Sequence, residues 1–187
     1  MMKSGKLTFI LGGARSGKSY YAERFAADFG GPVLYIATAE ALDEEMKVRI
    51  QNHQAARPRH WFTLESPRNV GKAFLAWQAE KGPDAVGLVL LDCLTLLTNN
   101  LALGQPDDVE ERALTDGLNA ELDDILAAIA ASRLHWLVVS NEVGLGLVPP
   151  YPLGRVYRDS LGRANQRLAA AADEVLFMVA GIPMKVK

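Results

Sequence analysis

Residues 12–19 read Gly-Gly-Ala-Arg-Ser-Gly-Lys-Ser, which is the G-x-x-x-x-G-K-[ST] phosphate-binding pattern. An apolar run, 7–11, precedes this pattern, and an amphipathic stretch, 19–29, follows it. Strand, loop and helix in this order are the setting that the motif requires, because loop N–H groups and the helix N-terminus bind phosphate together. We therefore expect a nucleotide-binding fold in which Lys18 reaches the β- and γ-phosphates and Ser19 ligates Mg²⁺.

Strand-like apolar runs alternate with helical patterns along the whole chain. The expected strands are 7–11, 33–37, 60–64, 85–91, 136–140 and 174–179. The expected helices are 19–29, 42–55, 70–81, 94–101, 109–132 and 155–172. This alternation predicts an α/β fold in a single domain, 1–187, with a mostly parallel sheet covered by helices on both faces. The segment 148–152 contains three prolines, which exclude a helix or a central strand there.

The strand pattern also predicts where a ligand binds, because ligands of open α/β sheets lie beyond the carboxyl ends of the strands. Besides the loop, the residues in such places are 38–40, Glu65, Asp92 and 141–142. Asp92 ends the apolar run 86–91, as in the second signature of phosphate-binding-loop folds, and its carboxylate would support Mg²⁺ near Ser19. Glu142 is expected either to orient a substrate hydroxyl or to belong to a simple turn.

The segment 42–55 contains a histidine on its apolar face. Leu42, Met46 and Ile50 form a stripe, and at ~100° per residue His53 falls on the same face. This pattern alone favours a partly buried structural histidine. Beside a bound triphosphate, however, a neutral imidazole with an ordinary pKa of ~6.5 is a competent nucleophile. Attack on the α-phosphorus would form a nucleotidyl-histidine and expel pyrophosphate, which Lys18 would stabilise.

The composition argues against several other classes of protein. The chain has 187 residues with 20 Lys and Arg against 22 Asp and Glu, so its formal charge of −2 does not favour nucleic acid as a partner. One cysteine, Cys93, cannot form an internal disulfide and is expected to be buried and inert. Three widely spaced histidines give no transition-metal signature. No apolar run approaches the ~18 residues of a membrane span, so we expect a cytoplasmic protein.

Over nearly its full length, the chain resembles the bifunctional adenosylcobinamide kinase / adenosylcobinamide-phosphate guanylyltransferase family of cobalamin synthesis. The stretches that resemble the family are 12–19, 35–38, 49–53 with 57–58, 90–93 with 98–99, 141–144 with 148–149, 158–159 and 162–168. The resemblance implies that a nucleoside triphosphate, ATP or GTP, phosphorylates the aminopropanol hydroxyl of adenosylcobinamide. It further implies that GMP passes from GTP, through a histidine, to adenosylcobinamide phosphate. A RecA-like P-loop fold, a three-layer sandwich, and a homotrimer are implied as well.

The resemblance also assigns roles to individual residues. The guanylylated histidine of the family matches His53, and Lys18 is the second expected catalytic residue. The nucleotide contacts of the family match Gly12, Gly13, Ala14, Arg15, Ser16, Gly17, Lys18, Ser19, Ala37, Thr38, Ala39, Gln54, Ala55, Ala56, Arg57, Glu65 and Asp92. Some members carry His-His where this chain has Asn52-His53. Some carry Glu in place of Asp92, which is one methylene shorter.

Two other functions remain open from the sequence. One is a P-loop small-molecule kinase with no covalent step. The other is a nucleotide-dependent switch or assembly ATPase, although the Asn-Lys-x-Asp tetrad by which GTP switches recognise guanine is absent from the sequence. Labelling of the protein by GTP separates the kinase from the covalent enzyme, since only the latter retains the α-phosphorus.

Overall fold

The computed structural model describes residues 5–41, 44–103 and 111–187. Its strands are β1 (Lys6–Gly12), β2 (Val33–Ala37), β3 (Phe62–Glu65), β4 (Leu88–Asp92), β5 (His135–Asn141), β6 (Glu174–Val179) and β7 (Ile182–Lys185). Its helices are α1 (Lys18–Asp28), α2 (Glu44–Ala56), α3 (Val70–Lys81), α4 (Leu94–Leu103), α5 (Glu111–Ala131) and α6 (Pro152–Ala171). Within these ranges, seven strands form one sheet in the order β3-β2-β4-β5-β1-β6-β7.

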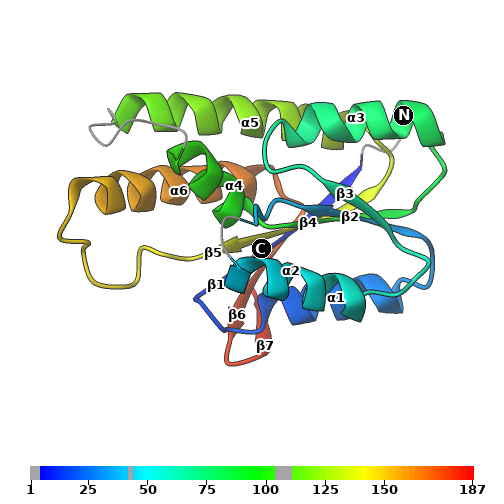
Figure 1. The fold of residues 1–187 in the computed structure, drawn as a ribbon, viewed down its shortest axis with the longest axis horizontal. Helices are drawn as coiled ribbons and strands as arrows, with labels where there is room; N and C mark the ends of the chain where they lie inside the picture. The colour runs from blue at the N-terminus through cyan, green and yellow to red at the C-terminus, as the bar shows by residue number, and fades with distance from the viewer. Residues whose placement is uncertain (1–4, 42–43, 104–110) are drawn as a thin grey trace.

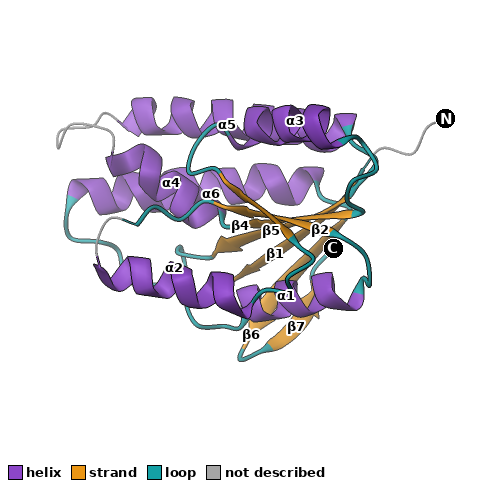
Figure 2. Cartoon of the chain, turned by 45° about the vertical axis from the view of Figure 1, so that its right-hand side comes forward, coloured by secondary structure: helices purple, strands orange, loops and turns teal. Residues whose placement is uncertain are grey.

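The sheet is parallel except for its last pair, in which β7 runs antiparallel to β6. Helices α3, α4, α5 and α6 lie on one face of the sheet, and α1 and α2 lie on the other (Figures 1 and 2). Parallel strands need crossover connections, and helices on both faces supply them. The expected α/β sandwich with a mostly parallel sheet is thus confirmed.

Two apolar cores fill the space between the sheet and its helices, one on each face. Successive side chains of a strand point to opposite faces, so Phe9 of β1 packs toward α3 and α5 while Ile10 packs toward α1. Trp136 of β5 is fully buried in the larger core. Its ring meets that of Phe74 edge-on at 4.7 Å between centroids, and its Nε1 donates to Ser132 Oγ at 3.0 Å. Burial on both faces explains the continuous apolar runs in the sequence.

The observed elements differ from the expected ones in a few places. Helix α6 begins at Pro152, inside the segment expected to exclude helix, because proline is favoured in the first turn, where its missing N–H would have no partner. Strand β7 was not expected, since its four residues are all exposed and carry no buried pattern. The third strand begins at Phe62 and not at 60. The expected starts at 42 and 109 lie outside the described residues.

In the described part of the chain, no helix has the length and apolar character needed to cross a membrane.

Candidate active site

The phosphate-binding loop connects β1 to α1, and two of its glycines are required by close backbone packing. A Cβ atom on Gly12 would lie 2.7 Å from both Met178 O and Ser16 Oγ. Gly17 precedes the first helical residue with a φ of +94°, in the left-handed region, and a Cβ there would lie 3.1 Å from Gly181 Cα. A side chain at either position would therefore displace the backbone of the loop or of the β6–β7 turn.

Lys18 lies in the first turn of α1 with only 7 % of its surface exposed. Its Nζ donates to the carbonyl oxygen of Gly13 at 2.6 Å. Burial lowers the pKa of Lys18 from its ordinary value, although the nearby charge of Asp92 acts in the opposite direction. A buried ammonium interacts favourably with an anionic phosphate, because the negative charge of the phosphate offsets the cost of burying the cation.

Asp92, at the end of β4, connects the loop to the neighbouring strands. Its Oδ1 accepts a hydrogen bond from Ser19 Oγ at 3.3 Å, and its Oδ2 accepts one from Tyr35 OH at 2.7 Å. The guanidinium of Arg57 covers the Tyr35 ring at 3.5 Å from the centroid. Burial, and then the charge of Asp92, raise the pKa of Tyr35, so its hydroxyl stays a donor.

The oxygens of Ser19 and Asp92 fit a magnesium ion. Mg²⁺ prefers hard oxygen ligands, keeps several waters and binds through one or two protein oxygens together with substrate phosphates. The hydroxyl and carboxylate oxygens already lie 3.3 Å apart beside the loop. No group of three or more His, Cys, Asp and Glu side chains able to hold a metal occurs among the described residues, and a Mg²⁺ site of this kind requires none.

A cavity of about 740 Å³ opens between the loop, α2 and the carboxyl ends of β2, β4 and β5. It brings together most of the expected nucleotide-binding residues, namely Ala14, Arg15, Ser16, Gly17, Lys18, Ser19, Ala37, Ala39, Arg57, Glu65 and Asp92. Its volume lies within the range of about 300–1,000 Å³ that holds small ligands. Most of the residues that are expected to bind the nucleotide therefore line a single concave space.

Other expected contacts lie beside this cavity without lining it: Gly12, Gly13, Thr38, Gln54 and Ala55. Thr38 Oγ1 accepts from the backbone N–H of Cys93 and donates to its carbonyl, both at 2.8 Å, so it fixes the chain after β4. Gln54 Nε2 donates to Glu65 Oε1 at 2.8 Å and joins α2 to the end of β3. These two side chains hold the wall of the cavity in place.

Helix α2 forms one side of the cavity through Met46, Lys47, Ile50 and Gln51. The backbone at position 53 continues this helix. The side chains of His53 and Ala56 lie outside the described part of the structure, as do Leu42 and the acidic residue after it. The role predicted for His53 therefore depends on the position of its helix beside the cavity.

Two residues of the cavity wall were not singled out for this role in the sequence. The Tyr35 hydroxyl reaches Asp92, and the only local signal is a polar group in an otherwise apolar strand, on the same face as Ala37. Cys93 lines the cavity and is half-buried rather than buried as expected. Burial raises the pKa of the Cys93 thiol to about 12, so it is protonated near neutral pH and a poor nucleophile.

Residues 8–186 match the family model described as cobinamide kinase / cobinamide phosphate guanyltransferase. The chain belongs to this family. It is 41% identical over 186 residues to the bifunctional adenosylcobalamin biosynthesis protein CobU of Escherichia coli (strain K12), covering 97% of this chain and 99% of that one. It is 46% identical over 178 residues to the corresponding protein CobP of Pseudomonas aeruginosa, covering 95% of each chain. Family membership makes the chain a kinase and guanylyltransferase that uses nucleotides.

A solved structure supports the fold assignment of this cobinamide kinase family member. The crystal structure of the RadB recombinase aligns with 94% of this chain and 75% of its own, with a TM-score of 0.53 at 15% identity. At this identity the likeness concerns the fold alone. The chain thus has the RecA-like P-loop fold expected from the sequence.

Proposed function

We propose that this chain phosphorylates adenosylcobinamide with ATP or GTP and then transfers GMP from GTP to the product through a guanylylated His53. The observation that supports this most directly is the contact of Ser19 with Asp92 beside the loop, inside a cavity whose other wall is α2. Position 53 follows Ile50 by one helical turn, and Ile50 lines the cavity.

The loop serves both reactions by binding the phosphates. Its N–H groups and the N-terminus of α1 hold the β- and γ-phosphates, and the Lys18 ammonium moves from the Gly13 carbonyl to a phosphate oxygen. Ser19 and Asp92 would hold Mg²⁺, which when bound neutralises part of the phosphate charge. Tyr35, stacked under Arg57, orients the Asp92 carboxylate by donating to Oδ2.

The guanylyl step is a double displacement. A ring nitrogen of neutral His53 attacks the α-phosphorus of GTP, an N–P bond forms, and the bond from the α-phosphorus to the bridging oxygen breaks, so that pyrophosphate leaves. An oxygen of cobinamide phosphate then attacks the same phosphorus, and the N–P bond breaks to release the histidine. Lys18 stabilises the departing pyrophosphate.

Labelling of the protein tests the covalent step. Wild-type protein incubated with GTP that is radioactive at the α-phosphorus should retain the label through alkali and lose it in acid, as a phosphoramidate does. His53→Ala should take up no label. His60→Ala is the matched control, because His60 is an exposed histidine on the turn that follows α2, and it should label as the wild type does. Equal labelling of His53→Ala, or none of the wild type, contradicts the proposal and favours a kinase without a covalent step.

The homotrimer implied by the resemblance and the cytoplasmic location expected from the sequence also belong to this proposal. Sedimentation equilibrium tests the first, with a mass three times that of the chain as the expected result.

A further inference from the structure

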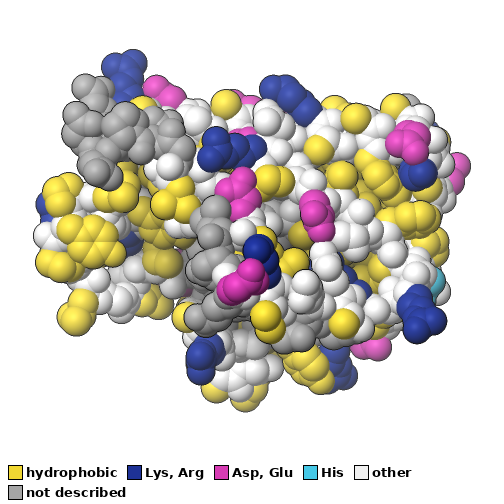
Figure 3. Space-filling view, in the orientation of Figure 1, with side chains coloured by type: hydrophobic (Ala, Val, Ile, Leu, Met, Phe, Trp, Pro, Cys, Tyr) yellow, Lys and Arg dark blue, Asp and Glu magenta, His cyan; other side chains and the backbone are white. Residues whose placement is uncertain are grey.

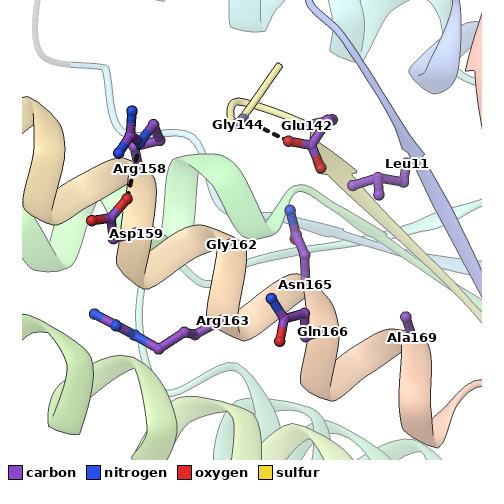
Figure 4. A pocket seen from close by; sticks show the side chains of 10 residues that line it. All are labelled: Leu11, Glu142, Gly144, Arg158, Asp159, Gly162, Arg163, Asn165, Gln166 and Ala169. Atoms are coloured by element: carbon purple, nitrogen blue, oxygen red, sulfur yellow. Dashed lines mark hydrogen bonds and ion pairs between the residues drawn. The ribbon is translucent and has the colours of Figure 1, made fainter. Parts of the chain in front are cut away.

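A second cavity, of about 470 Å³, lies at the carboxyl ends of β1 and β5 against α6. Its polar lining residues are Glu142, Arg158, Asp159, Arg163, Asn165 and Gln166. Asn165 on α6 and Glu142 beyond β5 lie on facing sides of this space (Figure 4). Arg158 Nε pairs with Asp159 Oδ1 at 2.9 Å, and the N–H of Gly144 donates to Glu142 Oε1 at 2.5 Å. The cavity thus combines an apolar floor at Leu11 with both signs of charge.

The two cavities lie on opposite sides of one strand tip. Asn141, the last residue of β5, lines the nucleotide cavity, whereas Glu142, its neighbour, lines the second one. Neighbouring residues of an extended chain point to opposite faces, and the N–H of Glu142 still pairs with the Gly12 carbonyl at 2.9 Å. Glu142 is therefore held beside the phosphate-binding loop, at the boundary between the two cavities.

Buried hydrogen bonds fix this tip. Asn165 is 5 % exposed, accepts from Ser140 Oγ at 2.7 Å, and donates from Nδ2 to the Asn141 carbonyl at 3.0 Å. On the other side, the Asn141 N–H donates to Thr95 Oγ1 at 2.8 Å. These hydrogen bonds hold the backbone at the end of β5 in one position. A side chain that acts on the terminal phosphate of a triphosphate benefits from this rigidity, because a small displacement of reacting atoms lowers the rate steeply.

We propose that the second cavity receives the hydroxyl-bearing side chain of the corrinoid acceptor and that Glu142 accepts the hydroxyl proton in the kinase step. This inference rests on the proposed function. In the step, the acceptor oxygen attacks the γ-phosphorus, an O–P bond forms, the bond from the γ-phosphorus to the bridging oxygen breaks, and a nucleoside diphosphate leaves. The hydroxyl proton passes to the Glu142 carboxylate.

The cavity has room for the side chain of the acceptor. In this proposal the corrin ring lies outside the cavity, against the connection from β5 to α6. This connection exposes Leu145 by 81 % and Leu147 by 96 %. Hydrophobic side chains gather at this end of the molecule in Figure 3. Arg155 Nη1 holds the connection by donating to the carbonyls of Pro149 and Pro150 at 3.1 and 2.9 Å. In the proposal, these exposed apolar side chains contact the corrin ring, since contiguous exposed apolar patches are typical of interaction sites.

Filling the cavity tests the binding part of the inference. Gly162 of α6 lines it, and no atom lies within 4 Å of a Cβ placed there, so Gly162→Leu projects into open space. We expect this variant to bind cobinamide about tenfold or more weakly than the wild type does. Binding is measured by titrating the visible absorbance of cobinamide in the presence of a non-hydrolysable nucleotide. The nucleotide affinity of Gly162→Leu should stay within about twofold of the wild-type affinity. The cobinamide affinity of Gly162→Ala should lie between those of the wild type and Gly162→Leu.

Gly117→Leu is the matched control, because Gly117 is also a half-buried helical glycine with no atom within 4 Å of its Cβ, but lies on α5 away from both cavities. Thermal unfolding of both leucine variants first shows that they fold. Wild-type cobinamide affinity in folded Gly162→Leu overturns the inference. Absence of cobinamide binding by the wild type overturns it too, and the His53 labelling shows separately whether the guanylyl step stands.

A second variant tests the role of the carboxylate. Glu142→Gln should lower kcat of cobinamide phosphorylation by about a hundredfold or more. Guanylyl transfer to cobinamide phosphate should keep its wild-type rate, because a phosphate acceptor is already ionised and has no proton to lose. Equal loss in both reactions, or an unchanged kinase rate, contradicts the assignment of Glu142.

Discussion

At the scale of single residues, the Asp92 carboxylate accepts hydrogen bonds from two hydroxyls on different elements, that of Ser19 on α1 and that of Tyr35 on β2. The Tyr35 hydroxyl leaves one carboxylate oxygen oriented toward Ser19. Because a ligand that is held in place loses less entropy on binding a metal, this orientation favours Mg²⁺.

Removing the Tyr35 hydroxyl should weaken the metal site without disturbing the core. In Tyr35→Phe the ring and its contact with Arg57 remain, so we expect the Mg²⁺ concentration for half-maximal kinase activity to rise about tenfold. Tyr157→Phe is the control, since that hydroxyl donates to the Thr95 carbonyl and lines neither cavity. A Mg²⁺ dependence equal to that of wild type in Tyr35→Phe would show that the hydroxyl does not orient Asp92.

At the scale of elements, the loop after β1 was predictable because its glycines, lysine and serine occur together in the sequence at fixed spacing. The strands 33–37 and 174–179 were predicted to the residue, since both are short apolar runs bounded by polar or turn residues. The contact of Tyr35 with Asp92 was not predictable, because it depends on β2 pairing with β4, in the register that sets Ala37 opposite Asp92. Strand β7 was missed for a similar reason, as its pairing with β6 leaves no buried pattern of its own.

The two halves of the phosphate-binding loop should differ in their tolerance of a side chain. Gly17→Ala puts a Cβ on a left-handed residue and against Gly181, so the free energy of unfolding should fall by about 1–2 kcal/mol. Gly13→Ala is the matched control, because a Cβ there meets no atom within 4 Å, and it should change stability by less than about 0.5 kcal/mol. Urea unfolding measures both. Similar losses in the two variants would contradict the packing argument.

At the scale of the whole molecule, β5 lies between β1 and β4 and pairs with both. The loop and Asp92 therefore belong to strands that are not neighbours, and the tip of β5 lies between them. The sequence predicted the carboxyl ends of the strands β1 to β6 to within one residue. The order of the strands in the sheet depends on long-range pairing that no local pattern encodes. This is why the second cavity was not expected, although Glu142 was a candidate.

The buried end of β5 should contribute strongly to global stability. Trp136→Ala removes a fully buried ring that contacts Phe74, and it should lower the free energy of unfolding by about 3–5 kcal/mol in urea titrations. Trp77→Ala serves for comparison, because Trp77 is only half-buried beside Phe62 and should cost about 1–2 kcal/mol. A smaller loss for Trp136→Ala than for Trp77→Ala would contradict the view that β5 forms the centre of the core.

The alternation at the tip of β5 also limits how this chain can change in evolution. Asn141 and Glu142 face different cavities because they are neighbours in extended chain at the end of β5. Inserting or deleting one residue before this pair would turn each side chain toward the opposite cavity, so the binding of both substrates would be disturbed at once. A substitution of either residue would affect only the cavity that it lines. Among relatives, this stretch should therefore keep a constant length.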